Sequence, residues 1–186
     1  QGAQPVTFPY LTKTSREGGD VVSAYIQASV MLGAVLIPVL GVASVASLPA
    51  IRLFFGGQWD AAAPIASILA VWAMCRYSHW FARDVLMAVG RDGLMVVREA
   101  VPFSILVPLI IWSYPEGLQA IAKAFVVTGS IDFVLTSFIL RYALGLRVQS
   151  FLLAYWSNLV VLATCTGAAW LIDNRFSLDT MSSWQA

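Results

Sequence analysis

Four side chains with binding chemistry recur at helical spacing in one apolar stretch: Arg76, His79, Trp80 and Arg83. On a continuous α-helix with about 100° per residue, these positions and Met87 fall within a stripe roughly 100° wide. Two guanidinium groups match the oxygen atoms of a phosphate, and an indole ring can lie along the arginine stems. The spacing therefore predicts a cationic and aromatic wall of a water-filled cavity, which would bind an anionic ligand.

Two carboxylates could modify this charge. Asp84 directly follows Arg83 and could neutralise part of the stripe. Asp132 lies in another apolar run, where it could pair with an arginine of the stripe, carry a coupling proton, or complete a packing network. A plainer interpretation keeps Arg83 and Asp84 near the cytoplasmic headgroups and leaves only Arg76 deep in the membrane.

Catalytic and metal chemistry have little support in the sequence. His79 is the single histidine, and Cys75 and Cys165 both lie inside apolar stretches, where cysteines are usually small packed side chains. The sequence contains no nucleophile elbow, no metalloprotease helix motif and no phosphate-binding glycine loop. We therefore expect a protein that is not an enzyme and that uses no metal and no cofactor.

The composition places these residues in a membrane. Hydrophobic residues make up 59% of the 186 residues and charged residues 11%, whereas soluble proteins carry about 25% charged residues. So few charges could not cover the surface of a soluble domain of this length. The net charge of +1 gives no reason to expect nucleic acid as a partner.

Long apolar runs predict membrane-spanning helices, each of which needs about 20 residues. A membrane β-barrel would instead show short segments of alternating polarity. We therefore expect an all-α integral membrane protein with one transmembrane domain over residues 1–186 and a kink at Pro38. The five predicted spans cover residues 21–51, 61–88, 94–112, 118–140 and 148–172.

Basic residues orient the spans. Six of them, Lys13, Arg16, Arg91, Arg98, Arg141 and Arg147, fall on the side of the N-terminus, and three, Arg52, Lys123 and Arg175, fall on the other. By the positive-inside rule the N-terminal segment is cytoplasmic, and an odd number of spans leaves the tail from residue 173 outside. This predicts a multi-pass protein of the cytoplasmic, or inner, membrane. Arg98, Glu99 and Lys123 lie near span ends, so their charged groups are expected to reach the headgroups.

Three motifs, in order, resemble those of a known family. They are Phe8-Pro9 before the first span, Phe55-Gly56-x-x-Trp59 followed by Ala-Ala-Pro64 between the first and second spans, and Ala88-x-Gly90-Arg91 at the end of the second span. The pattern resembles the polysaccharide exporters and oligosaccharide flippases of the MOP superfamily. In that family the first motif is cytoplasmic, the second marks an outside loop and the third closes the next helix inside. This sidedness agrees with the distribution of basic residues.

The resemblance implies part of a transporter of lipopolysaccharide or exopolysaccharide biosynthesis. The chain would form part of the second of two lobes, with the N-terminal lobe of the same protein missing from this sequence. Its cargo would be a polyprenyl-pyrophosphate-linked oligosaccharide, moved by alternating access between the lobes. The lipid bilayer and the lipid-linked glycan are the implied partners. A different class remains open, namely a membrane scaffold or subunit of a glycan-synthesis complex that transports nothing itself.

The resemblance also implies different roles for the residues of the stripe and for those of the family motifs. Arg76 and Arg83 would hold the pyrophosphate or acidic sugars, while Trp80 and Tyr77 would stack on sugar rings. The signature residues Phe55, Gly56, Trp59, Pro64, Gly90 and Arg91 would be structural. Among them, Gly56 and Pro64 would shape a turn and a helix start, and Trp59 would sit in the outer aromatic belt.

Overall fold

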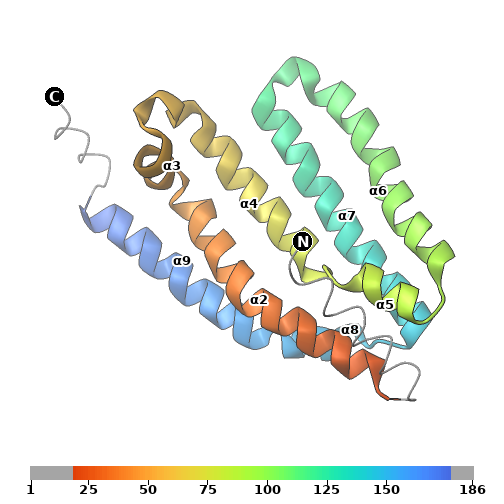
Figure 1. Cartoon of the computed structure of the whole chain (residues 1–186). Helices are drawn as coiled ribbons and strands as arrows, with labels where there is room; N and C mark the ends of the chain where they lie inside the picture. The colour runs from red at the N-terminus through yellow and green to blue at the C-terminus, as the bar shows by residue number, and fades with distance from the viewer. Residues whose placement is uncertain (1–18, 177–186) are drawn as a thin grey trace.

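The computed structural model of the chain describes residues 19–176 and shows an all-α membrane protein (Figure 1). Four helical stretches, Val21–Val45, Gly57–Ala88, Asp92–Glu116 and Leu118–Leu144, are long and apolar enough to cross a membrane. The pair Val148–Ala154 and Trp156–Ile172 is a fifth candidate if it counts as one span bent by 45°. The described residues contain no β-strand, because uninterrupted apolar runs can satisfy their backbone groups in lipid only as helices.

The predicted spans are divided more finely in the structure. The helices are α2 (Val21–Val45), α3 (Ser47–Phe55), α4 (Ala63–Ser78), α5 (Ala82–Ala88), α6 (Asp92–Ser113), α7 (Leu118–Leu144), α8 (Val148–Ala154) and α9 (Trp156–Phe176). Two 3-10 helices, η1 (Gly57–Ala62) and η2 (Tyr114–Glu116), join α3 to α4 and α6 to α7. The predicted span 21–51 is split between α2 and α3, 61–88 between α4 and α5, and 148–172 between α8 and α9. Pro38, the predicted kink, lies inside α2, and α2 is separated from α3 by a break at Ala46.

Helix α2 begins after a capping residue. Asp20 accepts hydrogen bonds from the backbone N–H groups of Val22 and Ser23, both at 3.1 Å, and from the Ser23 hydroxyl at 2.6 Å. These bonds occupy N–H groups that have no partner within the helix. They also hold the pKa of Asp20 below its usual range, with the Ser23 hydroxyl as the largest cause.

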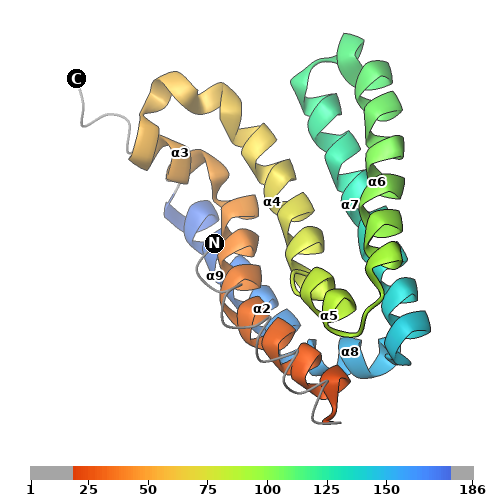
Figure 2. The same cartoon turned by 45° about the vertical axis from the view of Figure 1, so that its right-hand side comes forward.

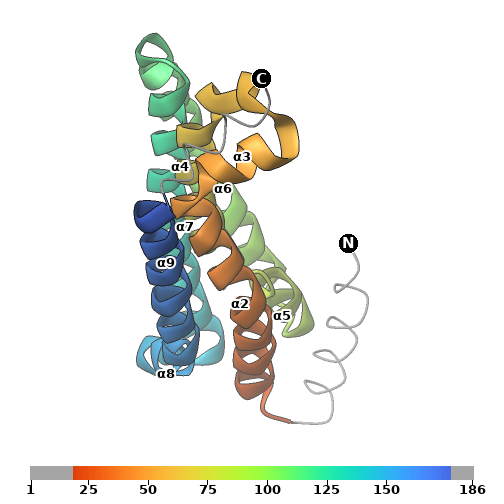
Figure 3. The same cartoon turned by 90° about the vertical axis from the view of Figure 1, so that its left-hand side faces the viewer.

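The long helices form an open row in the order α9, α2, α4, α7 and α6, each packed on the next (Figure 2). From the side, α2 and α9 lie next to each other, with α8 at one end (Figure 3). Gly41 allows this close approach, because a Cβ atom there would overlap Leu162 and would lie 2.9 Å from the Thr166 methyl carbon. Such an open row leaves long helix faces for lipid or for other parts of a protein.

The packed core lies at the end of the helix bundle where α5 and α8 are located. Its largest fully buried side chains include Tyr25, Leu86, Leu140 and Phe151, which come from α2, α5, α7 and α8. At the opposite end, the large apolar side chains of α3 are exposed. The polar groups described below are therefore held by a well-packed end of the molecule.

The break between α4 and α5 decides where the charged side chains point. No proline or glycine lies between Ser78 and Ala82, so the break has no local sequence cause. The Ala82 N–H bonds to the carbonyl of His79, which leaves the Ser78 carbonyl without its helical partner. That carbonyl accepts a hydrogen bond from the Tyr155 hydroxyl at 3.1 Å, and the same hydroxyl bonds the Ser29 carbonyl at 2.8 Å. A tertiary contact therefore stabilises the break.

The signature residues lie at the turns that flank α4 and α5. Gly56 ends α3 with φ = +85°, a conformation that favours glycine, and Pro64 lies in the first turn of α4. Phe55 and Trp59 are exposed in this segment. Gly90, with φ = +70°, ends the turn after α5, and Arg91 immediately precedes α6. The roles that the resemblance assigns to these residues, including the place of Trp59 in a membrane interface, stay predictions.

Some predictions concern residues beyond the described range. The Phe8-Pro9 motif, the cytoplasmic N-terminal segment and the external tail lie wholly or largely outside residues 19–176. The predicted orientation of the spans accordingly stays a prediction.

Candidate functional site

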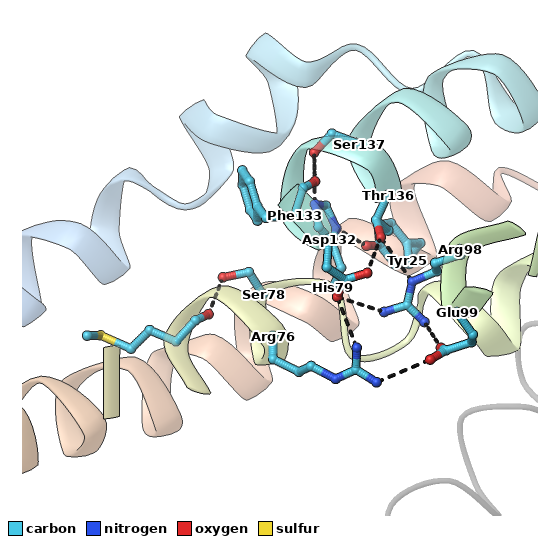
Figure 4. A network of polar contacts seen from close by, with 11 residues as sticks. Tyr25, Arg76, Ser78, His79, Arg98, Glu99, Asp132, Phe133, Thr136 and Ser137 are labelled. Carbon is cyan, nitrogen blue, oxygen red and sulfur yellow. Dashed lines mark hydrogen bonds and ion pairs between the residues drawn. The ribbon is translucent and has the colours of Figure 1, made fainter. Parts of the chain in front are cut away.

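Three neighbouring helices bring four charged side chains together. Arg76 comes from α4, Arg98 and Glu99 from α6, and Asp132 from α7 (Figure 4). Arg76 donates to Asp132 Oδ2 at 3.2 Å and to Glu99 Oε2 at 3.3 Å. Arg98 donates to Glu99 Oε1 at 2.9 Å, and its Nη2 atom lies 3.8 Å from Asp132 Oδ2. We call these four residues the charged cluster, whose formal charges cancel.

The two halves of the charged cluster differ in exposure. The side chains of Arg98 and Asp132 are 5% and 4% exposed, whereas those of Arg76 and Glu99 are 36% and 48% exposed. The hydroxyl of Thr136 joins the buried half, since it accepts from Arg98 Nε at 3.0 Å and donates to Asp132 Oδ1 at 3.3 Å. Burial of two charges is tolerable only when both are paired and hydrogen-bonded, and this arrangement meets that condition.

The exposed half of the charged cluster borders a cavity of about 300 Å³. Each of the three helices contributes an aromatic side chain to its wall: Trp72 from α4, Phe103 from α6 and Phe125 from α7. Trp72 and Phe125 meet edge to face with ring centroids 5.6 Å apart. The cavity therefore combines aromatic surface with donors and acceptors of both charges, as ligand sites commonly do.

A second group of polar side chains lies just after the break between α4 and α5. It is closed, meaning that it is buried and that its hydrogen bonds all go to protein atoms. His79 Nδ1 lies 2.7 Å from the Tyr25 hydroxyl, and Nε2 lies 2.9 Å from Ser137 Oγ. Because Ser137 already donates its hydrogen to the Phe133 carbonyl, it must accept from Nε2, which leaves Nδ1 to accept from Tyr25. We call Tyr25, His79 and Ser137 the histidine cluster. A neutral imidazole satisfies all of these bonds (Figure 4).

The structure separates the residues of the predicted stripe. Arg76 lines the cavity, His79 is buried in the histidine cluster, and Arg83 is exposed on α5. Trp80 is half-buried and packs on Tyr77, with ring centroids 4.8 Å apart. The single stripe was wrong, because it assumed one continuous helix from residue 76 to residue 87 and the helix breaks after Ser78. The substrate-binding roles assigned to these residues stay predictions.

Asp84 and Asp132, the two carboxylates that the sequence placed beside the stripe, have different surroundings. Asp132 pairs with Arg76, which was one of the alternatives that the sequence left open. Asp84 is buried on α5, and its Oδ2 atom has no hydrogen-bond partner among the described residues. It lies apart from the cavity wall, so the structure does not bring the two carboxylates into one site.

Sequence reasoning missed half of the charged cluster. Arg98 was expected to reach the headgroups, and this was wrong, because it is buried and bonded to Glu99 and Thr136. Spacing along one helix could not reveal Thr136 and Asp132, the partners of Arg98 that lie on α7. Lys123 is exposed near the start of α7. In the part of the chain that the structure describes, no group of three or more metal-ligating side chains occurs.

Comparison with known proteins finds a distant relative of the chain. No family model matches the chain, and no solved structure matches it. The chain is 26% identical over 178 residues to the teichuronic acid biosynthesis protein TuaB of Bacillus subtilis (strain 168). The aligned region covers 94% of this chain and 36% of the relative, so the chain spans about a third of the relative's length.

Proposed function

We propose that this chain is part of the second lobe of a flippase that moves polyprenyl-pyrophosphate-linked glycan across the cytoplasmic membrane by alternating access. The observation that carries the proposal is the charged cluster at a cavity between three apolar helices. Ionisable groups inside a membrane are costly, and they commonly line a transport path. The name of the relative, a teichuronic acid biosynthesis protein, supports a glycan as the cargo.

The rest of the transporter is part of the same proposal. Alternating access needs a second lobe, and the open row of helices leaves faces on which further helices could pack. The proposed partners are therefore the N-terminal lobe of the same protein, the bilayer and the lipid-linked oligosaccharide. The N-terminal segment would lie in the cytoplasm and the C-terminal tail outside, as the basic residues indicate.

Arg76 is the member of the charged cluster best placed to contact a cargo. Its side chain is 36% exposed and lines the cavity, whereas Arg98 is buried behind it. A guanidinium group carries five N–H donors, and the bonds to Asp132 and Glu99 leave others for a ligand. Arg98 would then act as a positioning residue that keeps Asp132 and Glu99 in place.

Export by variants of the full-length protein tests this role. We expect Arg76→Gln to lose most glycan export per molecule at near-normal membrane abundance, because Arg98 still pairs with both carboxylates. Arg76→Lys should keep part of the export, since it keeps the charge but loses the planar fork. The control is Arg141→Gln, an exposed position in the last turn of α7, which should export normally.

Two outcomes would count against the flippase. Normal export by Arg76→Gln at normal abundance would remove the charged cluster from the transport path. The purified full-length protein should also move lipid-linked glycan in reconstituted vesicles, measured by the access of an added glycosidase to the sugar. Failure there, with cellular export still dependent on the protein, would favour the scaffold of a glycan-synthesis complex.

A further inference from the structure

We propose that the cavity between α4, α6 and α7 binds one sugar ring of the glycan, and that the pyrophosphate binds elsewhere. The ring would lie against Trp72, and its hydroxyl groups would bond to Arg76 and Glu99 at the rim. This inference rests on the proposed function, because it names the part of the cargo that the cavity holds. It moves sugar stacking from Trp80 and Tyr77, which do not line the cavity, to Trp72.

Electrostatics favour a sugar over a pyrophosphate at this place. The two arginines of the charged cluster are matched by two carboxylates, and both carboxylates lie within 3.3 Å of Arg76. A pyrophosphate at Arg76 would therefore face two like charges at close range. A sugar hydroxyl can instead donate to a carboxylate and accept from a guanidinium, so it can join the charged cluster without breaking an ion pair.

The walls and the size of the cavity fit a single ring. Trp72, Phe103 and Phe125 provide apolar faces that suit the C–H face of a sugar, while the charged cluster provides the polar edge. The volume of about 300 Å³ is at the small end of ligand pockets, which run from about 300 to 1,000 Å³. It can hold one ring of a glycan but not a complete lipid-linked oligosaccharide.

Gly129 provides a way to disturb Trp72 without removing it. A Cβ atom at this position on α7 would lie 2.6 Å from Trp72 Cδ1, well inside van der Waals contact, so the indole would have to move. Gly167 on α9 is the matched control, because a Cβ atom there would meet nothing within 4 Å. Both substitutions replace a helical glycine by alanine, and only one reaches the cavity.

Cysteine protection in the full-length protein tests the inference. Leu106→Cys, on the cavity wall, is made in a background with Cys75→Ala and Cys165→Ala, and its rate of reaction with a maleimide is measured in nanodiscs. The probes are the methyl glycosides of glucose, galactose and N-acetylglucosamine, and inorganic pyrophosphate. We expect at least one glycoside to slow the reaction and pyrophosphate to leave it unchanged. Gln58→Cys, exposed in η1 and away from the cavity, should react at the same rate with every probe.

The variants then locate the contact. Trp72→Leu and Gly129→Ala should raise the glycoside concentration needed for half protection by about tenfold, because each removes or displaces the stacking surface. Gly167→Ala should leave that concentration unchanged. Gly129→Ala retains every polar group of the cavity, so it keeps the test valid if Trp72→Leu folds poorly.

Several results would overturn the sugar site. These are protection by pyrophosphate alone, protection by no glycoside, and a Leu106→Cys that is unreactive without any probe because another helix fills the cavity. Failure of the proposed function looks different. Glycoside protection in a protein that moves no glycan in vesicles would leave the sugar site standing and remove the flippase, whereas transport without protection would do the reverse.

Discussion

The charged cluster and the histidine cluster show two ways in which one helical bundle accommodates polar groups. In the histidine cluster Tyr25, His79 and Ser137 are buried, and each hydrogen bond ends on another protein atom. In the charged cluster Arg98 and Asp132 are equally buried, but Arg76 and Glu99 reach a cavity. A closed polar group has no capacity left for a ligand, whereas an open one has. Function is therefore expected at the charged cluster and structural support at the histidine cluster.

The two clusters are connected through the break after Ser78. Arg76 lies before the break and His79 after it, so the change of direction turns one residue to the cavity and the other to the core. The histidine cluster fixes this arrangement, because it ties the break to α2 and α7. Variants can therefore test whether the histidine cluster acts only through stability while the charged cluster also acts through ligand contact.

The largest effect on stability is expected in the buried half of the charged cluster. In Arg98→Leu, Asp132 keeps its bond to Arg76 but loses the nearby charge of Arg98. The Thr136 hydroxyl also loses the N–H group that donates to it. Removing one partner of a buried ion pair costs about 3–5 kcal/mol when the other charge is left uncompensated, and because Arg76 still bonds Asp132 we expect a loss near or below the lower end of that range. We expect a clear fall in the melting temperature of the purified full-length protein and in its membrane abundance.

A double variant separates charge from packing in this experiment. Arg98→Leu with Asp132→Leu removes a cation and an anion together and leaves Arg76 paired with Glu99, so much of the lost stability should return. A double variant no more stable than Arg98→Leu would show that the packing of Arg98, and not its charge, holds the site. In either case the double variant should export little, since the charged cluster is incomplete.

The next effect concerns the histidine cluster. Tyr25→Phe removes the hydroxyl that bonds His79 Nδ1 and leaves a buried acceptor unsatisfied, at a cost of about 1–3 kcal/mol. Abundance and export should fall together, so that export per molecule stays constant. Tyr142→Phe, at an exposed position on α7, is the control and should change neither quantity. A loss of export per molecule at normal abundance in Tyr25→Phe would place the histidine cluster in the transport path and end the distinction.

The sequence predicted the all-α class because the membrane imposes a simple rule. Apolar runs become helices in lipid, and the predicted start of α7 at residue 118 agrees with the structure. The break after Ser78 could not be predicted in this way, since it depends on Tyr155, which lies 77 residues further along the chain. The single face that joined Arg76 to His79 and Arg83 failed with the continuous helix, while the binding roles of these residues stay predictions.

The charged cluster could be predicted in part. An arginine and an aspartate inside separate apolar runs indicate a pair, because each is costly alone, and Arg76 and Asp132 do pair. Arg98 and Glu99 lie close to the N-terminal end of α6, where sequence position suits a headgroup as well as a buried bond. Only the packing of α6 on α7 decides between these two environments, and packing is not visible in one sequence.

The smallest effect is expected for an ion pair outside the packed end of the bundle. Arg52 and Asp60 join α3 to η1 with a two-pronged contact, from Nε to both carboxylate oxygens at 3.0 and 3.1 Å and from Nη2 to Oδ2 at 2.8 Å. Their side chains are 31% and 38% exposed, so water and salt screen the attraction. Exposed pairs contribute little to stability, because solvent screens them and holding two side chains in one geometry costs entropy.

Asp60→Asn tests how strongly solvent exposure limits the contribution of an ion pair to the stability of this protein. The substitution keeps the shape of the side chain and removes its charge, so the melting temperature should fall only slightly, and the difference from the wild type should shrink as sodium chloride is raised. Arg98→Leu, measured beside it, should lose far more stability, and salt should change that loss little, because Arg98 and Asp132 are almost completely buried. Equal losses at the two sites would mean that burial does not decide how much an ion pair contributes to the stability of this protein.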